Sequence, residues 1–302
     1  MTDKTHCGFV SLIGAPNAGK STLINQLVGS KVSIVTHKVQ TTRNRIVGLV
    51  MHDNCQIAFV DTPGIFTPQK RLEKAMVDAA WQGADEADII CLLVDAARHK
   101  RRDETLEIIK KLEKQKRRCI LILNKVDIAD KPKLLELAAA LNENDIFDQT
   151  FMISAKTGSG KKDLLDYLSS QLPEGPYLYD PDSLTDMPMR LFSAEITREK
   201  LFLQLQDELP YALAVETESY EVNEKGHVLI SQVIYITRDS HKPIVLGKGG
   251  SRIKRIGKES RLELEDILET KVNLKLFVKV RKNWVENPER YLEWGLDFDA
   301  NG

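Results

Sequence analysis

Short apolar runs alternate with amphipathic helical patterns along residues 1–172 of the chain. Each run has the length of a buried strand, and each helical stretch repeats apolar residues three or four positions apart. Such alternation is typical of a parallel sheet with helices on both faces, so it predicts a doubly wound α/β fold. The expected strands are Gly8–Ile13, Ile46–Val50, Gln56–Val60, Asp88–Val94, Arg118–Leu123 and Thr150–Ile153, and the expected helices are Ser21–Val28, Leu72–Gln82, Thr105–Lys114, Pro132–Leu141 and Lys162–Leu172.

A second pattern begins after a proline-rich stretch at residues 173–188. Its prolines and acidic residues show little periodicity, which predicts a linker of limited flexibility. The residues beyond it predict a smaller α+β domain, so we expect one domain at 1–172 and another at 189–302. The expected elements are a strand or helix entry at Met189–Ile196, a helix at Thr197–Leu205, strands at Ala212–Tyr220 and Val228–Thr237, a helix at Ser251–Leu268 and a strand at Asn273–Val280.

The composition is that of a globular protein with two domains. Of 302 residues, 42% are hydrophobic and 29% are charged, and the net charge is −1, so a nucleic-acid site would have to be local. No apolar run approaches the roughly 18 residues that span a bilayer, and no signal sequence begins the chain, which predicts a cytosolic protein, at most peripheral to a membrane. The cysteines form no metal-binding pair and indicate buried thiols in a reducing compartment: Cys7, Cys55, Cys91 and Cys119.

The segment from Gly14 to Ser21 reads G-x-x-x-x-G-K-S and lies between an expected strand and an expected helix. In this context, backbone N–H groups of a glycine-rich loop converge on phosphate oxygens at the start of a helix. The Lys20 ammonium can reach the β- and γ-phosphates, and the Ser21 hydroxyl can bind Mg²⁺. The motif predicts a nucleoside triphosphate site with contacts from Gly14, Ala15, Pro16, Asn17, Ala18, Gly19, Lys20, Ser21 and Thr22.

A second motif follows the third expected strand, at the sheet edge where open α/β sheets bind ligands. It consists of Asp61, Thr62, Pro63 and Gly64. The Asp61 carboxylate can hold the hydration shell of Mg²⁺ opposite Ser21, and the Gly64 N–H can sense a γ-phosphate from a mobile loop.

The base of the nucleotide is indicated by the sequence N-K-V-D at residues 124–127, after the fifth expected strand. The Asp127 carboxylate has two acceptor oxygens that match the N1–H and N2 amino donors of guanine, whereas adenine has no donor at N1. A site built on that pair rejects the wrong base by about 10⁴-fold. We expect Asn124 to tie this loop to the phosphate loop, and the expected guanine contacts are Asn124, Lys125, Asp127, Ser154, Ala155 and Lys156.

The second half of the chain contains a glycine loop in a basic stretch. Between Arg238 and Lys258 there are seven basic residues and one acidic residue, Asp239. Glycines let a sugar-phosphate backbone approach closely, and the helix that follows offers N–H donors, so the stretch predicts binding of single-stranded nucleic acid. The expected contacts are Lys242, Ile244, Gly247, Lys248, Gly249, Gly250, Ser251, Arg252, Lys254 and Arg255.

The first-half motifs resemble those of the translation-factor-like P-loop GTPases, over residues 8–172. The resemblance implies binding of GTP or GDP with Mg²⁺. It also implies that Ser33–Arg45 is the first switch loop, with Thr42 rather than Thr41 as the metal ligand in the GTP state. The candidate catalytic residues are then Lys20, Thr42 and Gly64, and the candidate metal ligands are Ser21, Thr42 and Asp61.

Ile65 departs from this family pattern. Many of these GTPases have a glutamine here that orients the attacking water, which an aliphatic side chain cannot do, so we expect slow unaided hydrolysis. Asn17 resembles the asparagine that helps to hold K⁺ beside the phosphates in potassium-activated members, which makes K⁺ a candidate cofactor. Asparagine is also a common turn residue, so Asn17 has a purely structural alternative.

The element order of the second half resembles a type II KH domain, and the whole chain is similar to the Era family of ribosome-associated GTPases. The resemblance rests on Gly14–Ser21, Gln40–Arg43, Asp61–Gly64, Asn124–Asp127, Pro173–Pro176 and Val245–Gly250. It implies binding of small-subunit ribosomal RNA near its 3′ end, a role in small-subunit assembly, and peripheral association with the inner face of the cell membrane.

Two alternatives remain open for the second half. It could be a protein-docking or dimerisation module under GTP control, or part of a GTPase that modifies transfer RNA, although no cysteine lies beyond residue 119 to serve as a catalytic thiol. Aromatic residues in the tail lie at spacings that suggest one helix face packed against the domain, with base stacking as the alternative. They are Trp284, Tyr291, Trp294 and Phe298.

Overall fold

The structure is a computed structural model that describes residues 4–98, 102–282, 284 and 288–298. The chain forms two compact units. The first unit contains Met1–Ser33, Thr42–Asp186 and Tyr291–Gly302, and the second contains Ile34–Thr41 and Met187–Arg290. Both units are therefore built from segments that are separated in the sequence, whereas the sequence analysis expected each domain to be one continuous segment.

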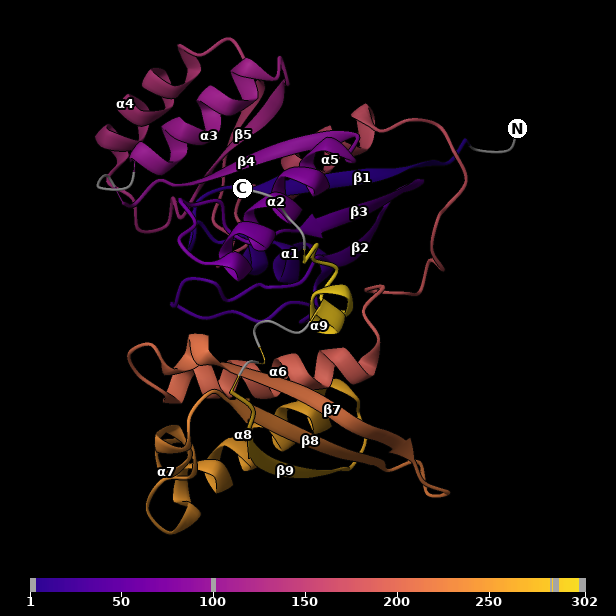
Figure 1. Cartoon of the computed structure of the whole chain (residues 1–302). Helices are drawn as coiled ribbons and strands as arrows, with labels where there is room; N and C mark the ends of the chain where they lie inside the picture. The colour runs from indigo at the N-terminus through magenta and orange to yellow at the C-terminus, as the bar shows by residue number, and fades with distance from the viewer. Residues whose placement is uncertain (1–3, 99–101, 283, 285–287, 299–302) are drawn as a thin grey trace. The chain divides into compact units, whose positions relative to one another are not determined.

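A six-stranded sheet forms the centre of the first unit (Figure 1). Its strand order is β2-β3-β1-β4-β5-β6, and neighbouring strands are parallel except for β2 and β3. β2 is antiparallel because a tight turn at Asp53, which has φ of 49°, returns the chain directly into β3. The expected parallel sheet therefore carries one antiparallel edge strand. The strands are β1 His6–Ile13, β2 Ile46–His52, β3 Cys55–Asp61, β4 Ile89–Asp95, β5 Cys119–Asn124 and β6 Phe147–Met152.

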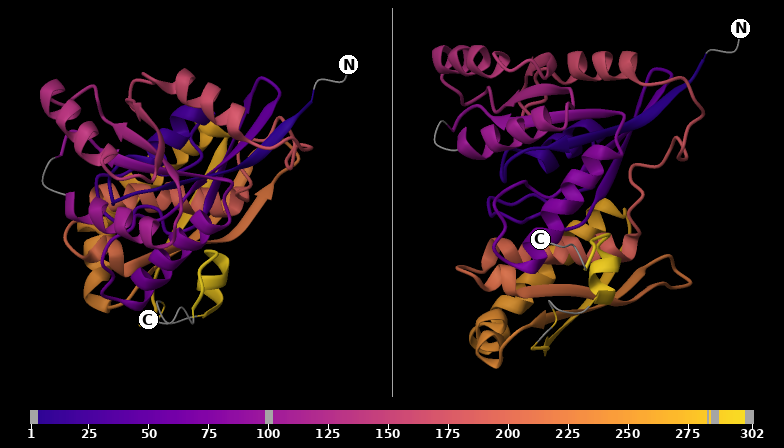
Figure 2. Two further views of the ribbon diagram at one scale, coloured as in Figure 1. Left: turned by 90° about the horizontal axis from the view of Figure 1, so that it is seen from above. Right: turned by 45° about the horizontal axis from the view of Figure 1, so that its top comes forward.

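Helices cover both faces of this sheet, as the sequence pattern predicted (Figure 2). Apolar residues of α1 and α5 pack on one face, and apolar residues of α2, α3 and α4 pack on the other. All four cysteines are buried free thiols, as expected. The helices are α1 Lys20–Val28, α2 Arg71–Asp85, α3 Arg102–Lys114, α4 Lys131–Asn142 and α5 Lys161–Gln171.

The second unit has a three-stranded sheet of order β7-β8-β9, and α6 and α8 bury their apolar residues against it. The segment from Met189 to Gln204 is one continuous helix, so the alternative of a strand at its start was wrong. The glycine loop is preceded by a short helix, α7. The elements are α6 Met189–Gln204, η2 Leu209–Ala212, β7 Leu213–Val222, β8 Val228–Ile236, η3 Asp239–His241, α7 Lys242–Leu246, η4 Lys248–Gly250, α8 Ser251–Ile267 and β9 Val272–Val280.

Residues 173–186 pack along the first unit, which differs from the linker that the sequence suggested. The Gln56 side chain accepts hydrogen bonds from the N–H groups of Leu178 and Tyr179, at 2.9 and 3.0 Å. Further along, the Leu49 N–H donates to the Leu184 carbonyl at 2.9 Å. Proline and acidic composition indicated a linker of limited flexibility, and composition does not show which side chains of the sheet form hydrogen bonds with its backbone.

Three of the tail aromatics, Trp284, Tyr291 and Trp294, are buried and Phe298 is half-buried, but they do not share one helix face. The helix α9 spans only Pro288–Glu293, and Trp284 precedes it. Trp284 is buried in the second unit, where its indole N–H donates to the Ala212 carbonyl at 3.2 Å. Tyr291 is buried in the first unit against the ring of Phe298. Packing therefore accounts for these rings, but in two separate places.

None of the helices in the described part of the chain is both long enough and apolar enough to cross a membrane.

Candidate functional site

The phosphate loop connects β1 to α1 and is held tightly against β4. Gly14 has φ of 151°, and a Cβ atom at this position would lie 2.4 Å from the Leu93 carbonyl oxygen, so only glycine fits. The apolar residues of β1 place the loop at the carboxyl edge of the sheet, as the motif predicted. Thr22 follows in the first turn of α1, where its side chain is half-buried.

Lys20 is the buried cation of the loop. It is 6% exposed, and its ammonium donates to the carbonyls of Gly14 and Ala15 at 3.0 and 3.3 Å. Burial lowers the pKa of Lys20 to about 8, and the nearby Asp61 carboxylate opposes that shift. The carbonyls of the loop thus hold the ammonium at the phosphate loop. This is the position from which the motif expects Lys20 to reach the β- and γ-phosphates.

Asp61, at the end of β3, is the centre of a cluster of hydroxyl groups. Its Oδ2 accepts hydrogen bonds from Ser21 at 2.7 Å, Ser33 at 2.7 Å and Thr42 at 3.3 Å. Burial raises the pKa of Asp61, while Lys20 and the three hydroxyls act in the opposite direction. The cluster brings together the three candidate metal ligands.

The same cluster fits Mg²⁺. The Oδ1 atom of Asp61 is buried and has no hydrogen-bond partner among the described residues. The Ser21 and Thr42 hydroxyl oxygens lie 3.0 Å apart beside this carboxylate, and Mg²⁺ prefers such oxygen ligands. The Thr41 hydroxyl instead hydrogen-bonds to Thr36 and to the Lys38 carbonyl, at 2.6 and 2.7 Å. The geometry therefore favours Thr42 over Thr41 as a ligand.

The loop after Asp61 contacts the phosphate loop directly. Gly64 lies against Pro16, and the Ile65 N–H donates to the Gly14 carbonyl at 3.0 Å. Ile65 is 7% exposed and packs in the core formed with α2, α3 and α4. Its aliphatic side chain cannot hydrogen-bond an attacking water. Thr62 donates to the Leu12 carbonyl at 2.8 Å, which anchors the start of this loop to β1.

The expected guanine loop is tied to the phosphate loop, as the sequence predicted for Asn124. The Asn124 amide donates to the Ala18 carbonyl at 2.8 Å and accepts from the Ala155 N–H at 2.9 Å. The Lys125 ammonium donates to the Asn17 carbonyl at 2.8 Å. Asp127 and Lys156 are exposed, while Ser154 and Ala155 are buried. Three separate loops therefore meet around Asn124, at the edge where a guanine would bind.

Two residues of the site were not predicted from the sequence, the carboxylate of Asp95 and the hydroxyl of Ser33. Asp95 ends β4 and pairs with the Lys125 ammonium at 2.6 Å, and its position after a strand was a usable signal. Ser33 hydrogen-bonds to Asp61, but it lies in a loop segment without a motif that would have identified it.

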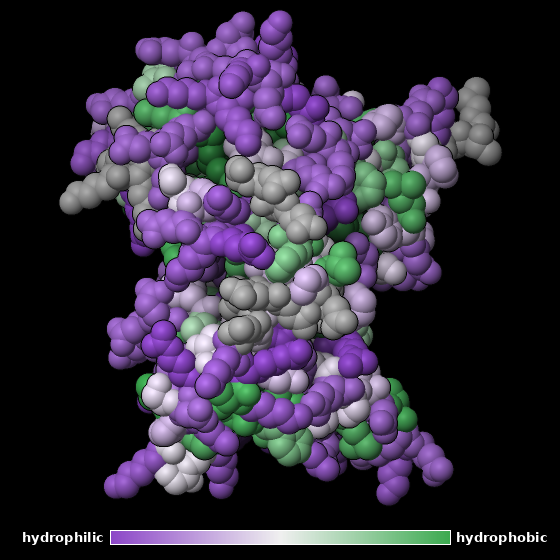
Figure 3. Space-filling model, viewed as in Figure 1, coloured by the Kyte–Doolittle hydropathy of each residue, from purple (hydrophilic) through white to green (hydrophobic). Residues whose placement is uncertain are grey.

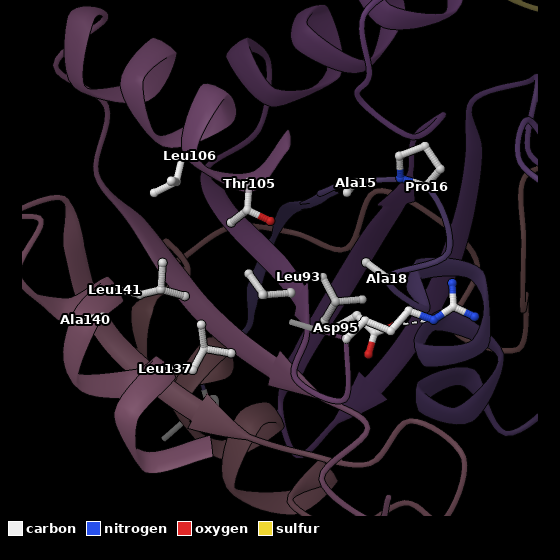
Figure 4. A pocket seen from close by; sticks show the side chains of 12 residues that line it. Ala15, Pro16, Ala18, Leu93, Asp95, Thr105, Leu106, Leu137, Ala140 and Leu141 are labelled. Atoms are coloured by element: carbon white, nitrogen blue, oxygen red, sulfur yellow. Dashed lines mark ion pairs between the residues drawn. The ribbon is translucent and has the colours of Figure 1, made fainter. Parts of the chain in front are cut away.

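An apolar cavity of about 200 Å³ lies beside the phosphate loop, between α3 and α4 (Figure 4). Ala15, Pro16 and Ala18 form its phosphate-loop side, and α4 contributes Leu137 and Leu141. Polar groups are few in its wall, so it offers little to a triphosphate. The polar cluster of Lys20, Ser21 and Asp61 is the better candidate for the phosphate site.

The glycine loop of the second unit carries exposed basic residues. Gly247, Gly249 and Gly250 have φ of 75°, 58° and 76°, and a Cβ atom at Gly249 would meet nothing within 4 Å. The buried Val245 anchors α7, while the Arg252 guanidinium donates to the Ile244 carbonyl. In Figure 3, hydrophilic side chains project around the position that α7 has in Figure 1. The exposed candidates are Lys242, Ile244, Lys248, Gly249, Ser251, Lys254 and Arg255, and the half-buried ones are Gly247, Gly250 and Arg252.

A buried polar cluster on α6 holds residues 34–41, which lie within the expected first switch and belong to the second unit. Glu199 is 3% exposed and accepts a hydrogen bond from the Val35 N–H at 2.8 Å. Arg198, also 3% exposed, pairs with Glu195 and donates to the Thr41 carbonyl. The expected helix gave no sign of these contacts, because charged residues on a helix usually face solvent.

Two family models match the chain. The model described as a 50S ribosome-binding GTPase matches residues 9–125, and that of the KH domain matches residues 208–285. The chain is 58% identical over 297 residues to the GTPase Era of Mesorhizobium japonicum, which covers 98% of this chain and 96% of that protein. It is 57% identical over 296 residues to the GTPase Era of Rhizobium meliloti, covering 97% of this chain and 94% of that protein.

Solved structures show the same similarity. A crystal structure of Era in complex with MgGDPNP and nucleotides 1506–1542 of 16S ribosomal RNA is 37% identical, with a TM-score of 0.89. A single-residue variant of Aquifex aeolicus Era bound to GDP.AlF4⁻ is 38% identical, also with a TM-score of 0.89. Each alignment covers 96% of this chain and 99% of the other.

Proposed function

Because this chain belongs to the Era family of GTPases, we propose that it is a GTP-controlled switch that binds small-subunit ribosomal RNA near its 3′ end and assists small-subunit assembly. The observation that carries the proposal is the likeness to the Era complex with MgGDPNP and 16S ribosomal RNA, which extends over 96% of this chain. One matching family model names the 50S subunit, but it spans only residues 9–125. The small-subunit assignment therefore has the wider support.

We assign the phosphate site to Lys20, Ser21, Thr42, Asp61 and Gly64. Lys20 binds the β- and γ-phosphates, and the Gly64 N–H donates to the γ-phosphate. Ser21 and Thr42 would hold Mg²⁺ with Asp61 behind its water shell, and the ion would neutralise charge that develops on the phosphate oxygens. Asp127 selects guanine through two hydrogen bonds, and Asn124 holds that loop in place. Hydrolysis is slow because Ile65 orients no water.

RNA binding is assigned to the glycine loop at residues 247–250. Gly249→Asp places a carboxylate in open space beside the basic side chains, and asparagine at the same position tolerates the positive φ without the charge. We expect Gly249→Asp to weaken binding of a single-stranded RNA from the small-subunit 3′ end by about tenfold or more, and Gly249→Asn to weaken it much less. Fluorescence anisotropy with the intact chain at two salt concentrations measures both effects.

Equal affinities for the parent chain and both variants would remove the RNA site from this loop. A chain that binds no RNA but oligomerises with concentration would instead support the docking module. Repeating the titration with GDP and with a non-hydrolysable GTP analogue tests the switch, because coupling between the nucleotide and RNA sites must alter both affinities by the same factor. Contacts of α6 with residues 34–41 support such coupling.

A potassium ion is proposed to act beside Asn17, whose φ is 64°. Positive charge next to the phosphates stabilises the transition state, as an arginine finger does elsewhere. We expect K⁺ to raise the GTP hydrolysis rate at least about tenfold over Na⁺, and Asn17→Gly to abolish the stimulation while keeping the backbone conformation. Phosphate release measured in K⁺ and in Na⁺ gives the ratio. Stimulation that survives in Asn17→Gly would leave Asn17 with only its role in the turn.

Association with the ribosome would place the protein in the cytoplasm. The further expectation of peripheral contact with the inner membrane surface rests on the family resemblance alone.

A further inference from the structure

Ser33 occupies a rigid position next to the expected metal site. It is 1% exposed, and its backbone is held by the Asn25 side chain of α1. Asn25 Oδ1 accepts from the N–H groups of Val32 and Ser33, both at 2.9 Å, and Asn25 Nδ2 donates to the Ser33 carbonyl at 2.7 Å. These three hydrogen bonds fasten Ser33 to the helix that begins at the phosphate loop.

The Ser33 hydroxyl uses this position to bind Asp61. It donates to Asp61 Oδ2 at 2.7 Å, a distance that matches the bond from Ser21. Asp61 is fully buried at the end of β3, so its carboxylate needs fixed donors to stay charged. Because Ser33 is bound to Asn25 of α1 and its hydroxyl to Asp61 of β3, it connects these two elements.

Ser33 differs in one respect from the other two hydroxyls on Asp61. Ser21 and Thr42 are the candidate metal ligands, so their oxygens must turn toward the ion when it binds. Ser33 is not a candidate metal ligand, and the hydrogen bonds of its backbone to Asn25 keep its hydroxyl next to Asp61 Oδ2. The opposite oxygen, Oδ1, is buried without a partner among the described residues. One oxygen of Asp61 is thus held by Ser33, while the other remains to accept from the metal's water shell.

We propose that Ser33, clamped by Asn25, is a positioning residue that orients Asp61 and thereby sets the Mg²⁺ affinity of the nucleotide complex. A carboxylate that is already oriented binds the hydrated ion without changing its conformation, whereas an unrestrained carboxylate loses side-chain conformational entropy when the ion binds. The inference rests on the proposed assignment of Asp61 to the Mg²⁺ shell. Since Ser33 touches neither phosphate nor base in this assignment, its effect is confined to the metal-dependent part of nucleotide binding.

The test measures release of a fluorescent GDP from the full-length chain across a Mg²⁺ titration, and again in excess EDTA. Ser33→Ala is expected to raise the half-saturating Mg²⁺ concentration about tenfold, with an unchanged release rate in EDTA. Asn25→Ala, which frees the Ser33 backbone but keeps its hydroxyl, is expected to produce a smaller shift in the same direction.

Ser11→Ala is the matched control. Ser11 is a fully buried serine in β1 whose hydroxyl has no hydrogen-bond partner within the described ranges. We expect it to leave the Mg²⁺ dependence unchanged. A shift in Ser33→Ala no larger than in Ser11→Ala would overturn the proposal, as would an equal acceleration of release in EDTA. If GDP release from the parent chain did not depend on Mg²⁺, the assignment of Asp61 to the Mg²⁺ shell would fail as well. The parent chain therefore tests the magnesium assignment, and the Ser33→Ala variant tests the role of Ser33.

Discussion

Asp127→Asn is expected to weaken GTP binding by about 10⁴-fold and to make xanthosine triphosphate the better ligand. In the proposed site the Asp127 carboxylate would accept hydrogen bonds from both N1–H and the 2-amino group of guanine, whereas an asparagine amide would place an NH₂ donor opposite that amino group. Xanthine has a carbonyl in place of the 2-amino group, so it offers the acceptor that the amide requires. Competition of each triphosphate against a fluorescent GDP measures both affinities.

The exposed position of Asp127 makes this substitution informative, because it disturbs no buried contact. Thermal unfolding should therefore be unchanged in the variant. Asp127→Ala is the control: it removes the acceptor without adding a donor, so it should weaken GTP binding without favouring xanthosine triphosphate. If Asp127→Asn kept its preference for GTP, the guanine site would have to lie elsewhere.

Arg198→Met is expected to lower the free energy of unfolding of the second unit by about 3–5 kcal/mol. The side chains of Arg198 and Glu195 are 3% and 9% exposed, so removing the guanidinium leaves the Glu195 carboxylate buried without its counter-charge. The Thr41 carbonyl also loses its donor, and residues 34–41 should exchange their amide hydrogens faster. Urea unfolding and hydrogen exchange by mass spectrometry of the full chain measure these two effects.

The double variant Arg198→Met/Glu195→Leu separates the cost of the unpaired charge from the loss of packing. Replacing a whole buried ion pair by apolar residues of similar volume is often neutral or stabilising, so the double variant should regain most of the stability. Faster exchange at residues 34–41 should persist, because the donor to Thr41 is still absent. A loss below about 1 kcal/mol in the single variant would mean that the pair is as solvated as a surface ion pair.

Most of the nucleotide site could be predicted from local sequence. The G-x-x-x-x-G-K-S loop, Asp61 and the N-K-V-D segment each follow a strand-like run, and parallel strands end at one edge of a sheet. Their meeting therefore follows from element order alone, and the Asn124 contact to the phosphate loop was predicted correctly. The strand and helix ranges of the first unit agree to within a few residues for the same reason, since hydrophobic periodicity is a local property.

Contacts between distant segments were beyond the reach of the sequence pattern. Ser33 looks like any loop serine until Asn25 and Asp61 are seen on either side of it. Likewise, the helix expected at Thr197–Leu205 gave no indication of which way its charged residues face, and the tertiary structure shows that Arg198 and Glu199 are buried. Residues 173–186 were predicted to be part of a linker, and their packing on the first unit was missed because their hydrogen-bond partners lie more than a hundred residues away, as in the pair of Leu178 with Gln56.

Two kinds of information thus describe this protein. Motif spacing and hydrophobic periodicity specify the α/β order, the phosphate loop and the candidate base-selecting residue Asp127, because each depends on residues that are neighbours in the chain. Burial of Arg198 and the clamp on Ser33 depend on which surfaces meet after folding. These tertiary contacts are set by long-range packing and by the need to give every buried polar group a hydrogen-bond partner, and no short stretch of sequence encodes them.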